Sequence, residues 1–323
     1  MSIGECIIDG TDIATLGMFI ERDGSNDLLS FPTLRKPDEN DWSEEDGLEV
    51  DLSGVTFDAK KVTISYVMIA DNYNLFKQRL NAFEQLHLQP QDRAIYVREF
   101  AKTFILRFTE FKGYNHKGGY YNPARKRARL AVEYWMDDPL QIYTGAISSP
   151  VGDPAGYSNV ALNSIDLSKY GIIVNEIYSS ALRPRSAKDV LVRRVNTVHG
   201  QVADDGEIGD TGVFVPKKKK SRELILDCTM IAESTNSLLI NMNALFNVLR
   251  SDMPVSLKLA YESIYCFYTK MSRFRKRTVF SRKVSVEFTI HLREVTWKQL
   301  IRLLATQQGY VIATQDGKII KTT

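Results

Sequence analysis

The sequence predicts an α+β protein built from two tandem copies of one β-rich sandwich or barrel domain, each with one flanking helix. Three observations support this prediction. The strand-and-helix pattern of residues 60–86 returns at residues 222–248, 162 positions later. The elements that follow it have the same order in both halves of the chain. Between the halves lies a stretch rich in Gly, Pro and small polar residues, as expected of a linker.

The repeated unit begins with a strand that runs into a helix. Over residues 62–86, six of the 25 positions are identical to those 162 positions later, among them Met68, Asn74 and Asn81. In both strands every second residue is apolar, which is the period of a half-buried strand. Apolar residues at helical spacing follow in both copies. The helix positions that we expect to be buried are Phe76, Leu80, Phe83, Leu238, Met242 and Leu245.

Three further strands complete each copy after Pro90 and Pro254, which cannot continue a helix. A short strand is expected at residues 95–99 and 255–259, and a longer one at residues 103–112 and 263–271. Hairpin tips at residues 113–123 and 272–281 then lead into a long closing strand. Each half therefore has the order β-α-β-β-β, preceded by a long irregular opening segment.

The repeat divides the chain into four parts. Residues 1–139 are expected to form the first domain, residues 140–168 the linker and residues 169–293 the second domain. Residues 294–323 are expected to form a short amphipathic helix followed by a hairpin around Asp316 and Gly317. The helix is suggested by the spacing of Trp297, Leu300, Ile301 and Leu304.

The composition is that of a soluble chain able to bury two cores. Of its 323 residues 44% are hydrophobic, the mean hydropathy is −0.22, and no run reaches the ~18 apolar residues that a membrane helix needs. The first residues lack the basic and apolar pattern of a signal peptide, so neither export nor a membrane partner is expected. Cys6, Cys228 and Cys266 have neither paired nor metal-binding spacing, and we expect reduced thiols in the core.

Charge differs between the two halves. The net charge is +3, but residues 1–139 carry −6 and the remainder carries +9. Residues 38–51 contain eight acids, whereas the corresponding stretch before the second copy, residues 183–194, is basic. Such runs are either solvated loops or matching interaction surfaces, and both interpretations are open. If the runs match, the candidate interface residues are Glu44, Glu45, Asp46, Arg185, Arg193 and Arg194.

No pattern of catalytic, cofactor-binding or metal-binding residues is present in the sequence. The four histidines are far apart and have no second ligand at metal spacing. Gly113 and Gly118 have the spacing of a phosphate-binding loop, but Gly119 stands where the loop needs its lysine. We therefore expect no catalytic residue, no cofactor and no metal. An enzyme with a cryptic site stays as an alternative.

A nucleic-acid-binding protein is the other alternative. Residues 217–220 are four lysines, and residues 273–277 contain three arginines and one lysine. Aromatic residues do not alternate with the four lysines as stacking platforms would, and the acidic first half argues against a nucleic-acid partner. We expect no specific nucleic-acid binding. The sequence does not assign a role to residues 217–220 or to residues 113–123.

Several stretches together resemble the N-terminal ring-forming domain of distal tail proteins of tailed bacteriophages, a family related to tail-tube and baseplate-hub proteins. They are residues 34–37 (Leu-Arg-Lys-Pro), Trp42 with the acidic run, residues 60–86 and the closing strands. The resemblance implies a virion structural protein without enzymatic activity. Its domains would add strands to a shared barrel in a six-fold ring around a channel, with the helices outside.

The chain departs from that family in one respect. The family usually has one ring domain followed by a carbohydrate-like or galectin-like domain, whereas the ring-type unit occurs twice here. Related tail hubs carry two tube-like domains per chain, and three such chains make a pseudo-six-fold ring. The resemblance thus implies a homotrimer or a hexamer, with tail-tube and tail-tip proteins as partners. It also implies assembly in the cytoplasm of the host bacterium and a place in the virion tail.

Overall fold

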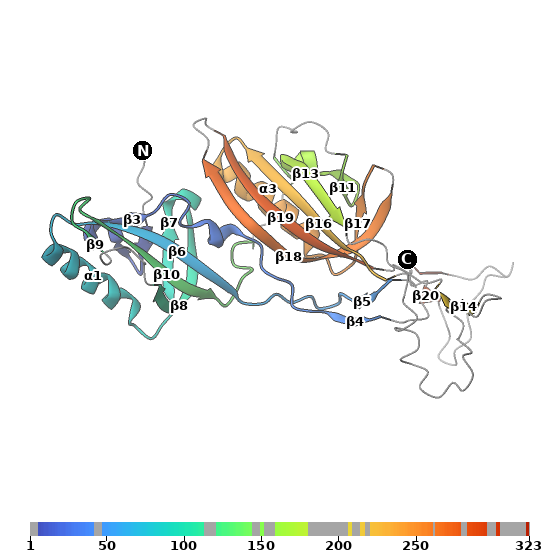
Figure 1. Cartoon of the computed structure of the whole chain (residues 1–323), viewed down its shortest axis with the longest axis horizontal. Coiled ribbons are helices and arrows are strands. Elements are labelled where there is room, and N and C mark those ends of the chain that lie inside the picture. The colour runs from blue at the N-terminus through green and yellow to red at the C-terminus, as the bar shows by residue number, and fades with distance from the viewer. Residues whose placement is uncertain are drawn as a thin grey trace.

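A computed structural model of the chain describes residues 6–41, 47–112, 121–143, 149–151, 159–179, 206–208, 214–216, 220–260, 262–278, 283–295, 302–303 and 321–322. The structural statements below concern these residues. Two antiparallel sheets lie next to each other, each accompanied by one long helix (Figure 1). None of the helices described is long and apolar enough to cross a membrane.

The first sheet has the strand order β2-β1-β7-β8-β10-β6-β3, and β9 pairs with β10. Its strands are β1 (Cys6–Ile8), β2 (Thr11–Asp12), β3 (Met18–Ile20), β6 (Lys60–Ile69), β7 (Arg93–Val97), β8 (Lys102–Lys112), β9 (Tyr121–Asn122) and β10 (Arg127–Met136). Helix α1 (Tyr73–His87) follows β6. Short 3₁₀ helices form η1 (Ile13–Leu16), η2 (Asn26–Leu29) and η3 (Arg98–Phe100).

The second sheet has the order β12-β11-β17-β18-β19-β16-β13, so each of its strands has a counterpart at the same position in the first sheet. Its strands are β11 (Ala161–Leu162), β12 (Ile165–Asp166), β13 (Ile172–Ser179), β16 (Glu223–Ala232), β17 (Val255–Lys258), β18 (Ser263–Thr278) and β19 (Val284–Glu294). Helix α3 (Thr235–Leu249) follows β16, and η4 (Leu167–Tyr170) precedes β13.

The helices of the two halves begin with equivalent caps. Asn72 caps α1 by accepting a hydrogen bond from the N–H of Leu75, and Ser234 caps α3 by accepting one from Ser237. The two caps are 162 positions apart, and so are the first residues of the two helices, Tyr73 and Thr235. The matching caps explain why a helix begins here in both halves.

A left-handed glycine ends the 3₁₀ helix before each edge strand. Gly17 (φ 64°) follows η1 and Gly171 (φ 70°) follows η4. A Cβ atom at Gly171 would collide with the carbonyl oxygen of Ile231, and one at Gly17 would collide with that of Ile69. Glycine is needed at both places because an L side chain is disfavoured at this φ and has no room.

The expected alternation of buried residues is confirmed in the long strands. Val62, Ile64, Tyr66 and Met68 of β6 are fully buried, as are the corresponding positions of β16. Five of the six helix positions expected in the core are buried, whereas Leu80 is only partly buried. The three cysteines are free and buried, as expected. Burial raises the pKa of each thiol to about 12, so these thiols are inert at neutral pH.

We expected residues 140–168 to be only a linker, and this is wrong for the C-terminal part of that range. β11 and β12 lie in that stretch and form one edge of the second sheet. Their turn is held by Asn163, whose N–H donates to the carbonyl of Ser256 and whose side chain accepts from the N–H of Ser256. Two-residue strands carry no period, so the sequence pattern could not reveal them.

Two further expectations need correction. The second hairpin tip was expected from residue 272, but β18 continues to Thr278 because it stays paired with β19 as far as Val284. Near the C-terminus, Arg302–Leu303 forms strand β20, paired with β21 (Lys321–Thr322), where a helix was expected. The rest of residues 296–323 lies outside the described residues.

In the described part of the chain there are also three two-stranded sheets, and β20 and β21 form one of them. β4 (Asp38–Asn40) and β5 (Glu49–Asp51) pair within the acidic run, and β14 (Gly206–Ile208) pairs with β15 (Phe214–Pro216). Figure 1 shows β4 and β5 reaching away from the first sheet and along the second. The segment that leads to them therefore crosses from one sheet to the other.

Candidate functional site

The two sheets meet at a group of aromatic side chains, here called the junction cluster: Phe31, Phe57, Tyr143, Phe246 and Tyr268. The ring of Phe31 lies 4.8 Å from Phe246 of α3, 5.4 Å from Tyr143 and 6.4 Å from Tyr268 of β18, measured between centroids. Phe57 lies 5.3 Å from Phe246. Aromatic pairs in this range contribute ~0.5–1.5 kcal/mol each beyond burial. The cluster thus joins the opening segment of the first half to the helix and long strand of the second.

Hydrogen bonds hold the same segment on β18. The N–H of Leu34 donates to the carbonyl of Thr269 (2.8 Å), and the hydroxyl of Tyr268 donates to the carbonyl of Pro32 (2.8 Å). Thr269 lies at a bulge, where the pairing of β18 with β19 skips one residue. A bulge leaves one residue without a ladder partner. The carbonyl of Thr269 therefore accepts a hydrogen bond from the N–H of Leu34. The segment is therefore fixed by its backbone as well as by its rings.

Behind the segment, Lys60 at the start of β6 binds two of its carbonyl groups. Its Nζ donates to the carbonyl oxygens of Ser30 (2.6 Å) and Leu28 (3.2 Å). Burial lowers the pKa of Lys60 to about 7, an effect that the Asp27 carboxylate opposes. The hydroxyl of Tyr143 donates to the carbonyl of Leu29 between them (2.6 Å). The carbonyl groups of three successive residues, 28–30, thus all accept hydrogen bonds from side chains behind the segment.

A cavity of about 610 Å³ opens beside the junction cluster. Its two ammonium groups already have partners. Lys60 binds the carbonyl groups, and Lys61 lies 3.2 Å from Glu133 and 5.2 Å from the centre of the Trp135 ring. Asp58 also lines the cavity, but there is no carboxylate pair or histidine in the lining. These groups can anchor a backbone, and they form no nucleophile-and-base arrangement.

Ion pairs also cross from the first half to the second. Arg293 of β19 lies 2.9 Å from Glu39 of β4, and Glu39 also lies 2.9 Å from Lys36. Lys276 of β18 pairs with Glu99, and its ammonium lies 5.7 Å from the centre of the Phe100 ring. Glu39 belongs to the acidic run, and it reaches a basic residue of the second half. Pairs of this kind set the register of two surfaces more than their affinity.

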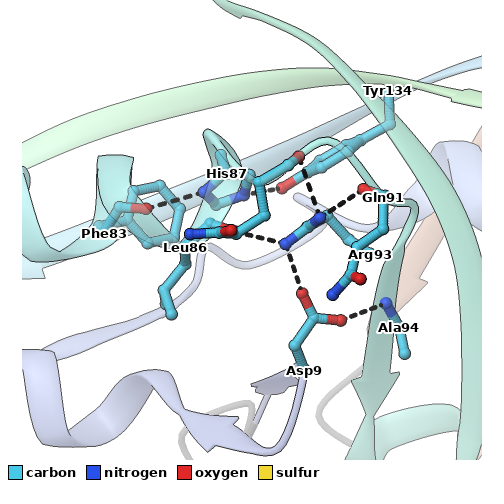
Figure 2. A network of polar contacts seen from close by, with 9 residues as sticks. Asp9, Phe83, Leu86, His87, Gln91, Arg93, Ala94 and Tyr134 are labelled. Carbon is cyan, nitrogen blue, oxygen red and sulfur yellow. Dashed lines mark hydrogen bonds and ion pairs between the residues drawn. The ribbon is translucent and has the colours of Figure 1, made fainter.

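A second polar group of interest lies inside the first half, at the end of α1 (Figure 2). Nη1 of Arg93 donates to the Asp9 carboxylate (2.7 Å) and to the carbonyl of Leu86 (2.8 Å), and its Nη2 donates to the carbonyl of Gln89 (3.1 Å). Asp9 also accepts from the N–H of Ala94 (2.8 Å). The network fixes the last turn of α1 to β7 and to the turn between β1 and β2.

His87 continues this network to β10. A carbonyl can only accept, so Nδ1–H of His87 donates to the carbonyl of Phe83 (2.8 Å), and Nε2 accepts from the Tyr134 hydroxyl (2.7 Å). Burial lowers the pKa of His87 to about 4, so the ring is neutral at pH 7. Tyr134 is also 3.3 Å from the Tyr66 hydroxyl. His87 is fully covered and lines neither of the cavities found beside the described residues. The arrangement is suited to positioning α1.

The structure does not describe the six candidate interface residues, which are Glu44, Glu45, Asp46, Arg185, Arg193 and Arg194. Most of residues 113–123 and three of the four lysines at 217–220 also lie outside the described residues. From the described part of the acidic run, Glu39 takes part in the contact between the two halves.

Sequence reasoning missed Phe31 and Phe57 as interface residues. One signal was present: the apolar stripe of α3 is wider than that of α1, because Phe246 stands where α1 has Glu84. Within the described residues, no cluster of three or more His, Cys, Asp or Glu could hold a metal ion.

Comparisons with known proteins add little. No protein-family model and no curated protein matches the chain. Among solved structures, the chain is similar to the SPP1 Dit (gp 19.1) protein, described as a paradigm of the hub adsorption apparatus in phages that infect Gram-positive bacteria. The similarity covers 92% of this chain and 100% of that one, with 10% identity and a TM-score of 0.34. At this TM-score, we infer neither fold nor function from it.

Proposed function

We propose that the protein is a non-enzymatic structural component of a phage or prophage tail that forms a ring at the distal end or hub and joins the tail tube to the tail tip. The junction cluster is the observation that carries this proposal. There, the opening segment of the first half packs on the helix and long strand of the second, so unlike surfaces are in contact. Contacts between unlike surfaces generate rings when their rotation closes. The resemblance of the sequence to ring-forming domains of distal tail proteins supports the phage assignment.

The two sheets are, in this proposal, copies of one tail-tube-like domain produced by internal duplication. Their common strand order, their matched helix caps and the paired glycines Gly17 and Gly171 support it. The first copy corresponds to residues 1–139. The second copy starts at about residue 160, since β11 belongs to the second sheet.

Three chains would then supply six domains to a pseudo-six-fold ring, and six chains would form a hexamer if only one domain of each enters the ring. The partners would be other copies of the chain and the tail-tube and tail-tip proteins above and below. The location would be the virion tail, after assembly in the host cytoplasm. No cofactor, metal or specific nucleic acid belongs to this function.

The mass of the purified protein in solution tests the ring. Light scattering at physiological salt should give three or six times the chain mass of 36.7 kDa, and electron micrographs of the same sample should show rings. A monomer at every concentration would overturn the proposal. A monomer that retards DNA, with affinity falling steeply as salt rises, would favour a nucleic-acid-binding protein instead.

Charge reversal tests whether the acidic and basic runs choose partners in the ring. Glu44, Glu45 and Asp46 are changed to lysine in one variant, and Arg185, Arg193 and Arg194 to glutamate in another. Each variant should assemble more slowly, and the combined variant should recover part of the rate, more clearly at low salt. Exposed pairs contribute only ~0–1 kcal/mol each, so the effect should be in rate and choice of partner. Equal assembly of all three variants would reduce both runs to solvated loops.

Nucleic-acid binding has less support in the structure. Two of the arginines in residues 273–277 are next to acids: Arg277 lies 3.0 Å from Glu287, and Arg273 lies 4.0 Å from Asp227. Lys276 is buried and paired with Glu99. Cations engaged in this way are less available to phosphates.

A further inference from the structure

Three polar side chains of the second sheet are hydrogen-bonded in a row, here called the polar row: Glu223 of β16, His291 of β19 and Ser272 of β18. Nδ1 of His291 lies 3.1 Å from the Glu223 carboxylate, and its Nε2 lies 2.9 Å from the Ser272 hydroxyl. The ladder partner of Ser272 is Thr289, two residues before His291. The partner of Glu223 is Arg293, two residues after it. Since side chains alternate along a strand, the row lies on one face, turned away from the buried residues of β19.

The chemistry of the acceptors decides where the protons of the polar row lie. An ionised carboxylate can only accept, so Nδ1–H of His291 donates to Glu223. In the neutral ring Nε2 is then the acceptor, and the Ser272 hydroxyl donates to it. The His291 side chain is 13% exposed, so little water competes for these hydrogen bonds. A hydroxyl bonded to a base that is itself oriented by a third group is the arrangement that activates a serine for acyl transfer.

The backbone is irregular directly after Ser272. The register of β18 on β19 shifts at this point, and a bulge of this kind re-aims the side chains beside it. Arg273 has a φ of 53°, which is uncommon and strained for a residue other than glycine. Its guanidinium lies 4.0 Å from Asp227, which also accepts a hydrogen bond from Thr289, the ladder partner of Ser272. A positive charge on this side of the serine favours the oxyanion that forms during acyl transfer.

The first sheet shows that the fold does not require a row of this composition. The corresponding positions hold Lys61 of β6, Glu133 of β10 and Lys112 of β8. As in the second sheet, the outer members pair two residues before and two residues after the middle one. There the middle residue is a carboxylate that forms an ion pair with each lysine. The same backbone positions thus hold ion pairs in one half, and an acid, an imidazole and a hydroxyl in the other.

We infer that Ser272 is a nucleophilic serine that takes up an acyl group from an activated ester, with His291 as the base and Glu223 as the positioning residue. Oγ of Ser272 forms a bond to the acyl carbon while its proton moves to Nε2 of His291. The C–O bond of the ester then breaks, and the proton passes from Nε2 to the leaving oxygen. The product is an O-acyl serine beside a neutral imidazole. This inference goes beyond the proposed ring and does not depend on it, because it concerns covalent modification of the chain and not turnover.

The ester p-nitrophenyl acetate tests this reaction on the full chain. Neither of the two cavities described above includes the polar row, so the acyl donor approaches from the open face and a small ester suffices. The parent should release roughly one p-nitrophenolate per chain in an initial burst, and peptide mass spectrometry should find the acetyl group on Ser272. Ser272→Ala should show no burst. Ser285→Ala is the matched control, because Ser285 also lies on β19 but its hydroxyl donates to the carbonyl of Arg277.

Variants of the other two members test their roles. His291→Gln should lower the rate of the burst by about 100-fold or more, as expected for loss of a general base. Glu223→Gln should also slow the burst, and Glu223→Asp should restore part of the rate, since a carboxylate can again orient the imidazole. Circular dichroism and thermal melting check the fold of each variant. If His291→Gln does not fold, diisopropyl fluorophosphate decides on the parent chain: it should attach its phosphoryl group to Ser272 and abolish the burst.

Several results would overturn the inference. Equal bursts from the parent and a folded Ser272→Ala would do so, as would acetyl groups found only on lysines. A folded His291→Gln that reacts as fast as the parent would show that Ser272 has no base. An unmodified Ser272 after treatment with the fluorophosphate would show that the serine is not activated. None of these results affects the ring, which the mass in solution tests separately.

Discussion

Phe31→Ala should weaken the junction between the two sheets more than any other single truncation in the opening segment. Phe31 is 3% exposed, and its ring contacts residues from α3, from β18 and from the stretch after β10. Truncation of a buried phenylalanine to alanine costs about 3–5 kcal/mol when the site cannot collapse. The carbonyl groups around Phe31 are held by Lys60 and Tyr143, which limits collapse. We therefore expect a loss near 3 kcal/mol or above by this rule.

A double-mutant cycle with Phe246→Ala separates the junction from general loss of core. The two rings are 4.8 Å apart, so the coupling should be about 0.5–1.5 kcal/mol. Urea unfolding followed by tryptophan fluorescence is a suitable assay, because Trp135 lines the cavity beside Phe31. The control cycle pairs Phe31→Ala with Phe104→Ala in the first-sheet core, where the effects should add within ~0.5 kcal/mol. A loss below ~1 kcal/mol, or equal coupling in both cycles, would refute the junction as described.

Three further changes test single contacts. Phe83→Ala should destabilise by about 3–5 kcal/mol in equilibrium unfolding, because the ring is fully buried, and a loss below ~1 kcal/mol would remove this helix face from the core. His87 has a folded pKa of about 4 against ~6.5 unfolded, so the unfolded state binds more protons between these values and stability falls by about 3 kcal/mol as pH drops through them. His87→Leu should flatten this part of the stability profile in titrations of unfolding free energy, and an unchanged slope would contradict a neutral buried His87. Gly171→Ala should lower stability by at least ~1–2 kcal/mol, with Gly10→Ala, which has open space at a similar φ, as a milder control in thermal melts.

Long periodic elements could be predicted from the sequence, because their cause is local. The alternation in β6 and β16 and the apolar stripes of α1 and α3 record which side of each element is buried. The caps Asn72 and Ser234 act within one turn of the chain. Short elements could not be predicted in this way. β11 and β12 exist because Asn163 binds the backbone of Ser256, far along the chain.

In the candidate site, too, some features could be predicted from the sequence and others could not. The opposite charge of the two halves is a property of the sequence, and it pointed to a contact between unlike surfaces. The sequence did not reveal that Phe31 is the residue that makes this contact, because a lone Phe-Pro in an irregular segment has no period. It also left His87 as the end of a helix, although in the fold the side chain connects Phe83 to Tyr134 in a buried network.

By itself, the sequence determined that the chain contains the same strand-and-helix pattern twice, with buried faces in the same phase and with opposite charge. Only the tertiary structure decided that the second helix is covered by a segment of the first half. The physical reason is that periodicity reports burial against any partner, whereas the identity of the partner depends on where distant segments meet. Phe246 and Glu84 occupy the same helix position, and the contact with Phe31 in the folded chain gives that difference its meaning.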